Sequence, residues 1–270
     1  MYHRLLIPVD DASEVEPMIR LGSRMLDAGG EIRVLHVIPT VTIPQVTRGW
    51  RSSVNIVIPA HEAGAALDVR VDPEVRASVD VVGDILDSAE SHEVDAIVMT
   101  LRGDRRSRNP FVGHTASSIL HHARCDVVVV NRLALAADKF PRIIVPTFSG
   151  LPAPKILQLA EEFALRNPGI TIITLSLVAR KRTDEPPSPP TEGRSPRGFP
   201  VKHKTAMIPE AMLVRRRRLP ELILQAAARE RYGLLLVGEE TVRGEGTLLT
   251  RRFLEELFRA APCPVVAVRG

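Results

Sequence analysis

The sequence predicts an α/β protein made of two successive, doubly wound parallel sheets with five strands each. Short apolar runs at residues 96–99 and 127–130 suit strands that are buried on both faces of a parallel sheet. Segments with helical periodicity alternate with such runs, which is the order of βαβ units. Aromatic residues make up only 4% of a chain that is 44% hydrophobic, so the cores are expected to be aliphatic.

A repeat within the chain favours two domains over one large domain. Residues 5–8 match residues 143–146, residues 85–86 match residues 223–224, and Ala123 with Cys125 matches Ala261 with Cys263, each at an offset of 138 positions. Separate anchors that share one offset indicate a tandem duplication. The chain of 270 residues also exceeds the usual size of one domain. We therefore predict one domain at residues 1–135 and a second at residues 139–270.

The first strand is predicted at residues 4–9. Ser13 and Glu16 have the spacing of a capping box, so a helix is expected to begin there. Gly29 and Gly30 are expected to end this helix, because glycine is common just beyond a helix carboxyl end. The second strand then follows at residues 32–38.

The next part of the first half gives weaker signals. Pro44, Pro59 and Gly64 disfavour a long helix, so we predict at most a short one over residues 61–66. The elements after it are clearer, namely a strand near residues 74–78 and a helix over residues 80–92.

The second half contains a proline-rich segment at residues 183–200, which follows a strand predicted at residues 170–177. Proline, glycine and serine together favour an extended, mobile, solvated loop. A partner-binding segment is the alternative interpretation.

The stretch from 95 to 130 reads as strand, loop, helix and strand, with Gly113, His114 and Thr115 opening the helix. A loop that enters a helix amino terminus gathers free backbone N–H groups and the positive end of the helix dipole. This arrangement binds anions, above all phosphate. Gly103 and Gly113 would let the main chain approach such a group closely, since neither carries a Cβ.

This stretch resembles the universal stress proteins, whose ATP-binding members carry G-x2-G-x9-G-(S/T) between their fourth and fifth strands. In that register stand Thr100, Gly103, Gly113 and His114, with Thr115 one place later. Thr100 thus replaces the first glycine, and His114 replaces the hydroxyl residue. The resemblance implies an adenine-nucleotide α-hydrolase-like fold with strand order 3-2-1-4-5.

Ligands of such sheets bind beyond the carboxyl ends of the strands, where the winding reverses. The implied crevice lies between the first strand, ending at Asp10, and the fourth, ending at Thr100. The residues that the resemblance assigns to a nucleotide site are Pro8, Val9, Asp10, Val37, Met99, Thr100, Gly103, Gly113, His114 and Thr115. The implied ligand is ATP or another adenine nucleotide, with Mg²⁺ only when ATP is bound. For Asp10 and Asp11 an Asx turn before the helix is the alternative interpretation.

No catalytic residue is predicted, since the sequence shows neither a carboxylate pair for a metal nor a placed general base. Any ATP hydrolysis is therefore expected to be slow. At the offset of 138 the second half carries Phe148 in place of Asp10 and Arg251 in place of Gly113. We predict no ATP site in the second half.

Arginines gather in two places, and a solvated surface explains them as well as anion or partner binding does. They are Arg102, Arg105 and Arg106 in the first half and Arg215, Arg216, Arg217 and Arg218 in the second. Nucleic acid is disfavoured, because no aromatic residues are interleaved with these arginines. The alternative to a nucleotide-binding regulator is a scaffold protein that acts through these loops.

The charge of +4 and the pI near 9.4 indicate a mildly basic surface. No apolar run reaches the length of about 18 residues for a membrane span, and the first residues enter a strand, so a cytoplasmic protein is expected. The two cysteines predict neither a zinc site nor a disulfide.

By resemblance the last strands, at residues 127–130 and 265–268, pair as an internal pseudo-dimer. The sequence leaves open whether two chains also form a homodimer. The Thr100 motif and the pair Ser78 and Asp80 also resemble stress-protein domains that accompany membrane transporters, so a regulatory role beside a protein or transporter is a further expectation.

Overall fold

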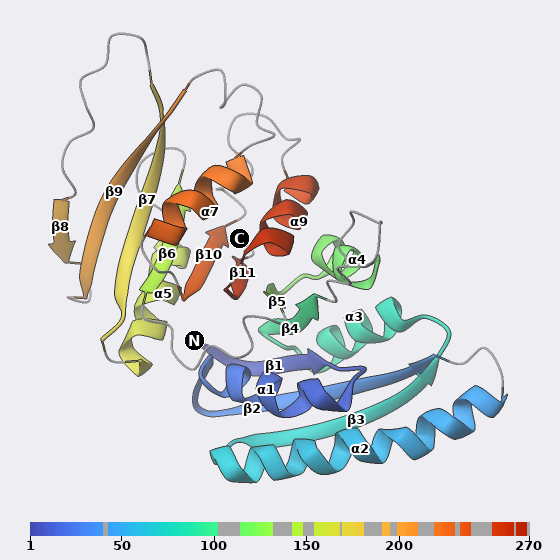
Figure 1. Ribbon diagram of the computed structural model, residues 1–270. Helices are drawn as coiled ribbons and strands as arrows, with labels where there is room; N and C mark the ends of the chain where they lie inside the picture. Colours follow the sequence, from blue (N-terminus) through green and yellow to red (C-terminus); the bar gives the residue numbers. More distant parts are fainter. Residues whose placement is uncertain are drawn as a thin grey trace. The chain divides into compact units, whose positions relative to one another are not determined.

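A computed structural model describes residues 1–39, 43–101, 114–131, 142–147, 154–167, 169–180, 191–194, 199–209, 219–229, 233–238, 250–261 and 263–268. The chain forms two compact units, Met1–Ala136 and Ala137–Gly270, and each contains a sheet with helices (Figure 1). No helix in the described part of the chain is both long and apolar enough to cross a membrane.

The first unit is built on a parallel sheet. Its strands are β1 (Tyr2–Pro8), β2 (Leu26–Pro39), β3 (Arg70–Ser78), β4 (Ala96–Leu101) and β5 (Asp126–Asn131). They lie in the order β3-β2-β1-β4-β5, and every neighbouring pair is parallel. This is the predicted order 3-2-1-4-5, and the winding reverses between β1 and β4.

Helices cover both faces of this sheet. They are α1 (Ala12–Ser23), α2 (Ile43–Leu67), α3 (Val81–Ser91) and α4 (His114–His122). α1 packs against α2 and α3 packs against α4, one pair on each face (Figure 1). The central strands are buried along their length, as the side chains of Leu6, Ile97 and Val127 show. The core is aliphatic, as the composition predicts.

The start of α1 and its end differ from the prediction. Asp11, and not Ser13, is the N-cap, and its Oδ1 accepts hydrogen bonds from Ser13 N at 2.9 Å and Ser13 Oγ at 2.8 Å. The helix ends at Ser23, whereas Gly29 and Gly30 lie within β2. Gly29 has φ +80°, and the pairing of β1 with β2 is irregular there, so these glycines form a strand irregularity and not a helix end.

The prediction for residues 61–66 was wrong, because α2 extends over Ile43–Leu67. Pro44 lies in the first turn, where a missing N–H costs little. Gly64 is a point of close approach, because a Cβ there would lie 2.6 Å from Cγ2 of Val71 on β3. Figure 1 shows α2 running along β3. Packing on the sheet thus stabilises a helix that its own proline at Pro59 disfavours.

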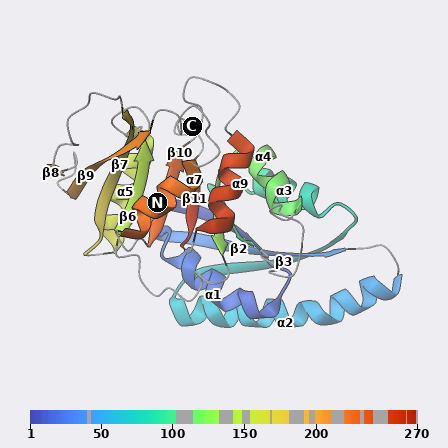
Figure 2. The ribbon, with the colours of Figure 1, turned by 45° about the horizontal axis from the view of Figure 1, so that its top comes forward.

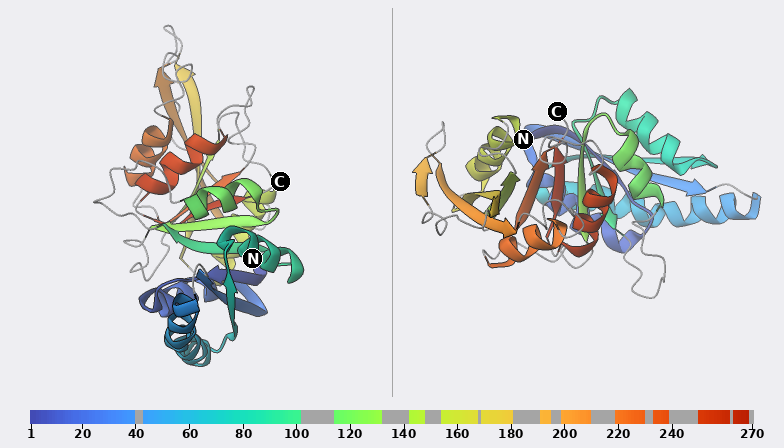
Figure 3. Two further views of the ribbon diagram at one scale, coloured as in Figure 1. Left: turned by 90° about the vertical axis from the view of Figure 1, so that its right-hand side faces the viewer. Right: turned by 90° about the horizontal axis from the view of Figure 1, so that it is seen from above.

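The second unit has the same strand order with one addition. Its strands are β6 (Arg142–Thr147), β7 (Thr171–Arg180), β8 (Thr191–Arg194), β9 (Pro200–Pro209), β10 (Leu234–Gly238) and β11 (Val265–Val268). They lie in the order β11-β10-β6-β7-β9-β8. The long parallel pair of β7 and β9 is seen in Figure 3. The helices are α5 (Pro154–Arg166), α7 (Leu219–Arg229) and α9 (Thr250–Ala260), of which α7 and α9 pack together (Figure 2).

The extra strand corrects the predictions of a five-stranded second sheet and of a loop at residues 183–200. β8 pairs antiparallel with β9, with Thr191 opposite His203. An edge strand of this kind needs only one partner, so it can form within a segment whose prolines exclude it from the middle of a sheet. Residues 181–190 and 195–198 lie outside the described part.

Candidate functional site

A cavity of about 190 Å³ lies at the carboxyl edge of the first sheet, beside the reversal between β1 and β4. Its lining comes from the carboxyl ends of three strands and from the amino-terminal halves of two helices. The lining residues are Pro8, Val9, Asp10, Leu35, Val37, Val81, Ile85, Met99, Thr100, Thr115 and Ala116. Parallel sheets place their ligand sites at such a reversal, because the helices on either side of it leave opposite faces.

The structure brings together most of the residues assigned to the site from the sequence. Pro8, Val9, Asp10, Val37, Met99, Thr100 and Thr115 all line this cavity. His114 is the first residue of α4, and its side chain lies outside the description. Also outside it are Gly103, Gly113, Arg102, Arg105, Arg106, Phe148 and Arg215 to Arg218.

Sequence reasoning missed four lining residues. Leu35 lies two positions before Val37 on β2, and alternation along a strand would have placed both on one face. Val81 and Ile85 are one helical turn apart on α3, so they too share a face. Ala116 follows Thr115 in the first turn of α4, and no local signal distinguishes it.

Backbone and side-chain contacts fix the end of β1. Val9 N donates to Leu35 O at 2.9 Å, which continues the ladder to β2 for one residue beyond β1. The carbonyl of Val9 accepts a hydrogen bond from Nδ1 of the buried His36 at 2.9 Å. Asp11 caps α1, while the exposed Asp10 stands at the cavity. The two neighbouring carboxylates therefore have different positions, one in the Asx turn and one at the cavity.

A buried carboxylate holds Thr100. The hydroxyl Oγ1 of Thr100 donates to Oε2 of Glu14 at 2.8 Å, and Glu14 is only 3% exposed. Glu14 lies in the first turn of α1, where the helix dipole favours a negative charge. Because the hydroxyl proton points to Glu14, the Thr100 oxygen can only accept a hydrogen bond from a molecule in the cavity.

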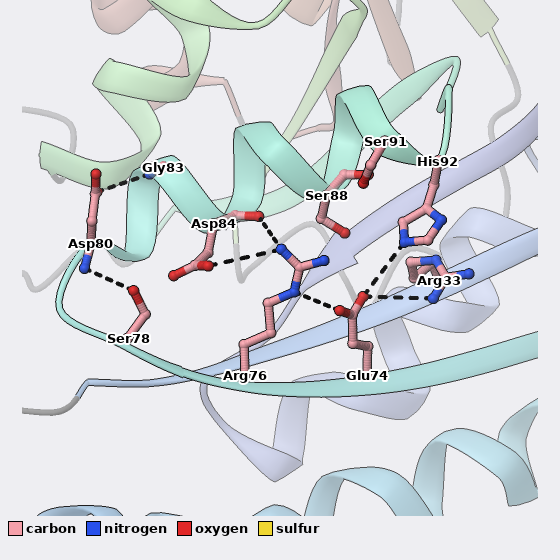
Figure 4. Close-up of polar contacts among 10 residues, drawn as sticks. All are labelled: Arg33, Glu74, Arg76, Ser78, Asp80, Gly83, Asp84, Ser88, Ser91 and His92. Atoms are coloured by element: carbon pink, nitrogen blue, oxygen red, sulfur yellow. Dashed lines mark hydrogen bonds and ion pairs between the residues drawn. The ribbon is translucent and has the colours of Figure 1, made fainter.

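A cluster of polar side chains fixes α3 (Figure 4). This helix carries Val81 and Ile85, which line the cavity. Asp80 is the N-cap, and its Oδ1 accepts from Gly83 N at 2.9 Å. Arg76 on β3 donates through Nε to Glu74 Oε1 at 2.5 Å and lies 3.8 Å from Asp84 Oδ1 on α3. The first turn of α3 is thus anchored to the neighbouring strand.

The cluster also contains the pair singled out in the sequence. Ser78 Oγ accepts a hydrogen bond from Asp80 N at 3.1 Å (Figure 4). Both side chains therefore shape the turn that leads from β3 into α3.

The cavity has apolar walls and few polar groups. Aliphatic side chains from β1, β2, α3 and β4 form most of the lining, and Asp10, Thr100 and Thr115 supply the polar atoms. Ligand sites for small molecules are commonly of this kind, with mostly apolar walls and a few polar groups that fix orientation. The amino terminus of α4 begins beside it, where backbone N–H groups favour an anion. No cluster of three or more His, Cys, Asp or Glu that could hold a metal occurs among the described residues.

Residues 1–131 match the model of the Universal stress protein family. The first unit belongs to the universal stress protein family. The match spans β1 to β5, so it includes every residue that lines the cavity. No curated protein matches the chain.

Solved structures share the fold over both units. A universal stress protein from Archaeoglobus fulgidus DSM 4304 has a TM-score of 0.69 and 16% identity, covering 98% of this chain and 96% of that one. A putative universal stress protein from Pseudomonas aeruginosa UCBPP-PA14 has a TM-score of 0.60 and 11% identity, covering 99% and 93%. A functionally unknown protein from Pseudomonas aeruginosa PAO1 has a TM-score of 0.61 and 9% identity, covering 99% and 92%. At these identities the likeness shows the fold alone.

Proposed function

We propose that the first unit binds ATP or a related adenine nucleotide in the cavity beside β1 and β4, and that binding regulates a stress response. The observation that carries this proposal is the cavity itself. It gathers Asp10, Val37 and Thr100, which are distant in sequence, at the reversal of a universal stress protein sheet.

The chemistry of the lining supports this ligand class. An adenine ring would be enclosed by the aliphatic side chains of Val37, Ile85 and Met99. Asp10 and Thr100 offer hydrogen-bond acceptors, which suit the hydroxyl groups of a ribose. Phosphate groups would lie toward the amino terminus of α4. Mg²⁺ belongs to the proposal only as the companion of bound ATP.

Calorimetric titration with ATP, ADP and adenosine, with and without Mg²⁺, tests the site. Ala116→Phe would place a ring in the cavity, and Asp10→Ala removes a carboxylate from its edge. Val79→Phe is the matched control, because Val79 is 83% exposed and does not line the cavity.

We expect one nucleotide per chain. The affinity should be at least about tenfold lower in Asp10→Ala, since a hydrogen bond to a charged group contributes about 1.5–3 kcal/mol. It should fall as much in Ala116→Phe, because the new ring occupies the cavity. The control should bind as wild type does. Failure of the wild-type protein to bind any of the three ligands, or equal binding by all variants, would refute the proposal.

We infer that the second unit does not bind the nucleotide. At the offset of 138 it carries Phe148 where the first unit has Asp10, and Arg251 where it has Gly113. The first change removes the acceptor, and the second puts a long side chain where the main chain should approach phosphate. A stoichiometry of two nucleotides per chain would contradict this inference.

A further inference from the structure

The solvent-facing side of α2 carries an apolar stripe. Trp50, Val54 and Ile58 are 48%, 50% and 52% exposed, and their spacing of four residues places them along one side of the helix. The opposite side packs on the first unit, where Ala60 is fully buried and Ile56 is 4% exposed. Three bulky side chains in a row on the outside of a helix are unfavourable in water unless something covers them.

Two opposite charges flank this stripe. With about 100° of rotation per residue, Arg51 lies about 60° and Glu62 about 80° around the helix from Val54, on the same flank. Both side chains are exposed, and neither has an ion-pair partner among the described residues. They are about 16 Å apart along the axis, too far to pair within one helix.

We propose that the stripe is covered by α2 of a second copy of this chain, packed antiparallel about a twofold axis. In an antiparallel pair each flank of one helix meets the same flank of the other, so Arg51 and Glu62 face their counterparts. With the axis level with Ile56, Val54 meets the partner's Ile58. In that same register Arg51 lies within one residue, about 1.5 Å along the axis, of the partner's Glu62.

The self-complementary charges favour a second copy over other occupants. A twofold interface uses one patch twice, so a base and an acid on the same flank form two identical ion pairs. A lipid surface would favour a helix face rich in lysine and arginine, whereas here Arg51 is balanced by Glu62. The surface area that a single helix pair buries is smaller than the ~1,000 Å² of stable interfaces, so the dimer is weak and its population depends on concentration.

The test uses the full chain. Sedimentation and tryptophan emission are followed from about 1 µM to about 1 mM, a range that brackets weak association. Trp50 is the only tryptophan, so a blue shift that grows with concentration reports burial of the stripe. The variants are Val54→Asp, Arg51→Glu, Glu62→Arg and the double variant Arg51→Glu/Glu62→Arg, with Val79→Asp as the control at an exposed valine outside α2.

We expect wild type and the control to dimerise equally and Val54→Asp to stay monomeric. Each single charge reversal should raise the Kd about tenfold, because the twofold axis repeats each surface pair. The double variant should regain the wild-type Kd, since the charges are exchanged. A wild type that stays monomeric at about 1 mM, or a double variant no better than the single ones, would overturn the proposal. Emission is also measured with added vesicles of anionic lipid, and a blue shift seen only with these vesicles would overturn it as well.

Discussion

Replacing Thr100 by valine would test whether the buried contact with Glu14 holds the cavity edge. The substitution keeps the shape of the side chain and removes the hydroxyl that donates to Glu14 Oε2 at 2.8 Å. A hydrogen bond to a charged group contributes about 1.5–3 kcal/mol. Because Glu14 is only 3% exposed, water cannot replace the lost donor. We expect the free energy of unfolding of the first unit to fall by about 2 kcal/mol.

A double-mutant cycle with Glu14→Met isolates this contact. In Glu14→Met the hydroxyl has no carboxylate to donate to, so Thr100→Val should cost little more there, and the coupling energy should be about 2 kcal/mol. Urea unfolding followed by the emission of Trp50 reports the first unit alone, because the chain has no other tryptophan. A coupling energy below about 0.5 kcal/mol would refute the argument.

Two other substitutions test the packing and the pH dependence of the first unit. Gly64→Ala should lower stability by about 1–2 kcal/mol in urea unfolding, because a Cβ there would lie 2.6 Å from Cγ2 of Val71 and 3.0 Å from Val69 O, and this overlap outweighs the gain in helix propensity. In a Val71→Ala background the same substitution should cost less, since the contact with Cγ2 is gone, and an equal cost there would show another cause. Burial, and then the charge of Asp126, raise the pKa of Tyr2 well above 10.0, and its hydroxyl donates to Asp126 Oδ2 at 3.0 Å. Tyr2→Phe should lose about 1–3 kcal/mol at neutral pH. The Tyr2 hydroxyl keeps its proton to a higher pH in the folded form than in the unfolded form, so the free energy of unfolding of the wild type falls above pH 10.0. The difference in stability between wild type and Tyr2→Phe should therefore shrink there, and a difference that stays constant with pH would contradict this.

The strands of the first unit could be predicted from the sequence because their signal is local. Runs such as residues 127–130 are apolar at every position, as strands buried on both faces must be, and β5 contains this run. The helix α2 could not be predicted in the same way. Pro59 and Gly64 are local signs against a helix, whereas the fit of Gly64 against Val71 depends on a strand that comes later in the chain.

The residues of the site also differ in whether a local signal in the sequence could identify them. Asp10 follows the end of β1 and Thr100 lies next to the end of β4, so topology alone places them at one edge, and both line the cavity. The contact between Thr100 and Glu14 joins residues that are 86 positions apart, and no motif indicates it. It depends on α1 lying against β4 in the folded unit. Side-chain partners of this kind follow from packing and not from spacing.

The registers of the two sheets support the proposal that the units arose by duplication and then diverged at the site. Leu5 pairs with Ala96 in the first unit, and Ile143 pairs with Leu234 in the second, so both partners move by the same 138 positions. The next pair behaves alike, since Ile97 lies opposite Val127 and Leu235 opposite Val265.

The strand reversal between the first and fourth strands is therefore present in both units, and the strand order alone does not distinguish the two edges. The difference lies in side chains such as Asp10 and its counterpart Phe148. A carboxylate can accept hydrogen bonds from the hydroxyl groups of a ribose, whereas a phenyl ring has no oxygen that could do so. If the proposed nucleotide site is correct, this difference predicts a stoichiometry of one nucleotide per chain.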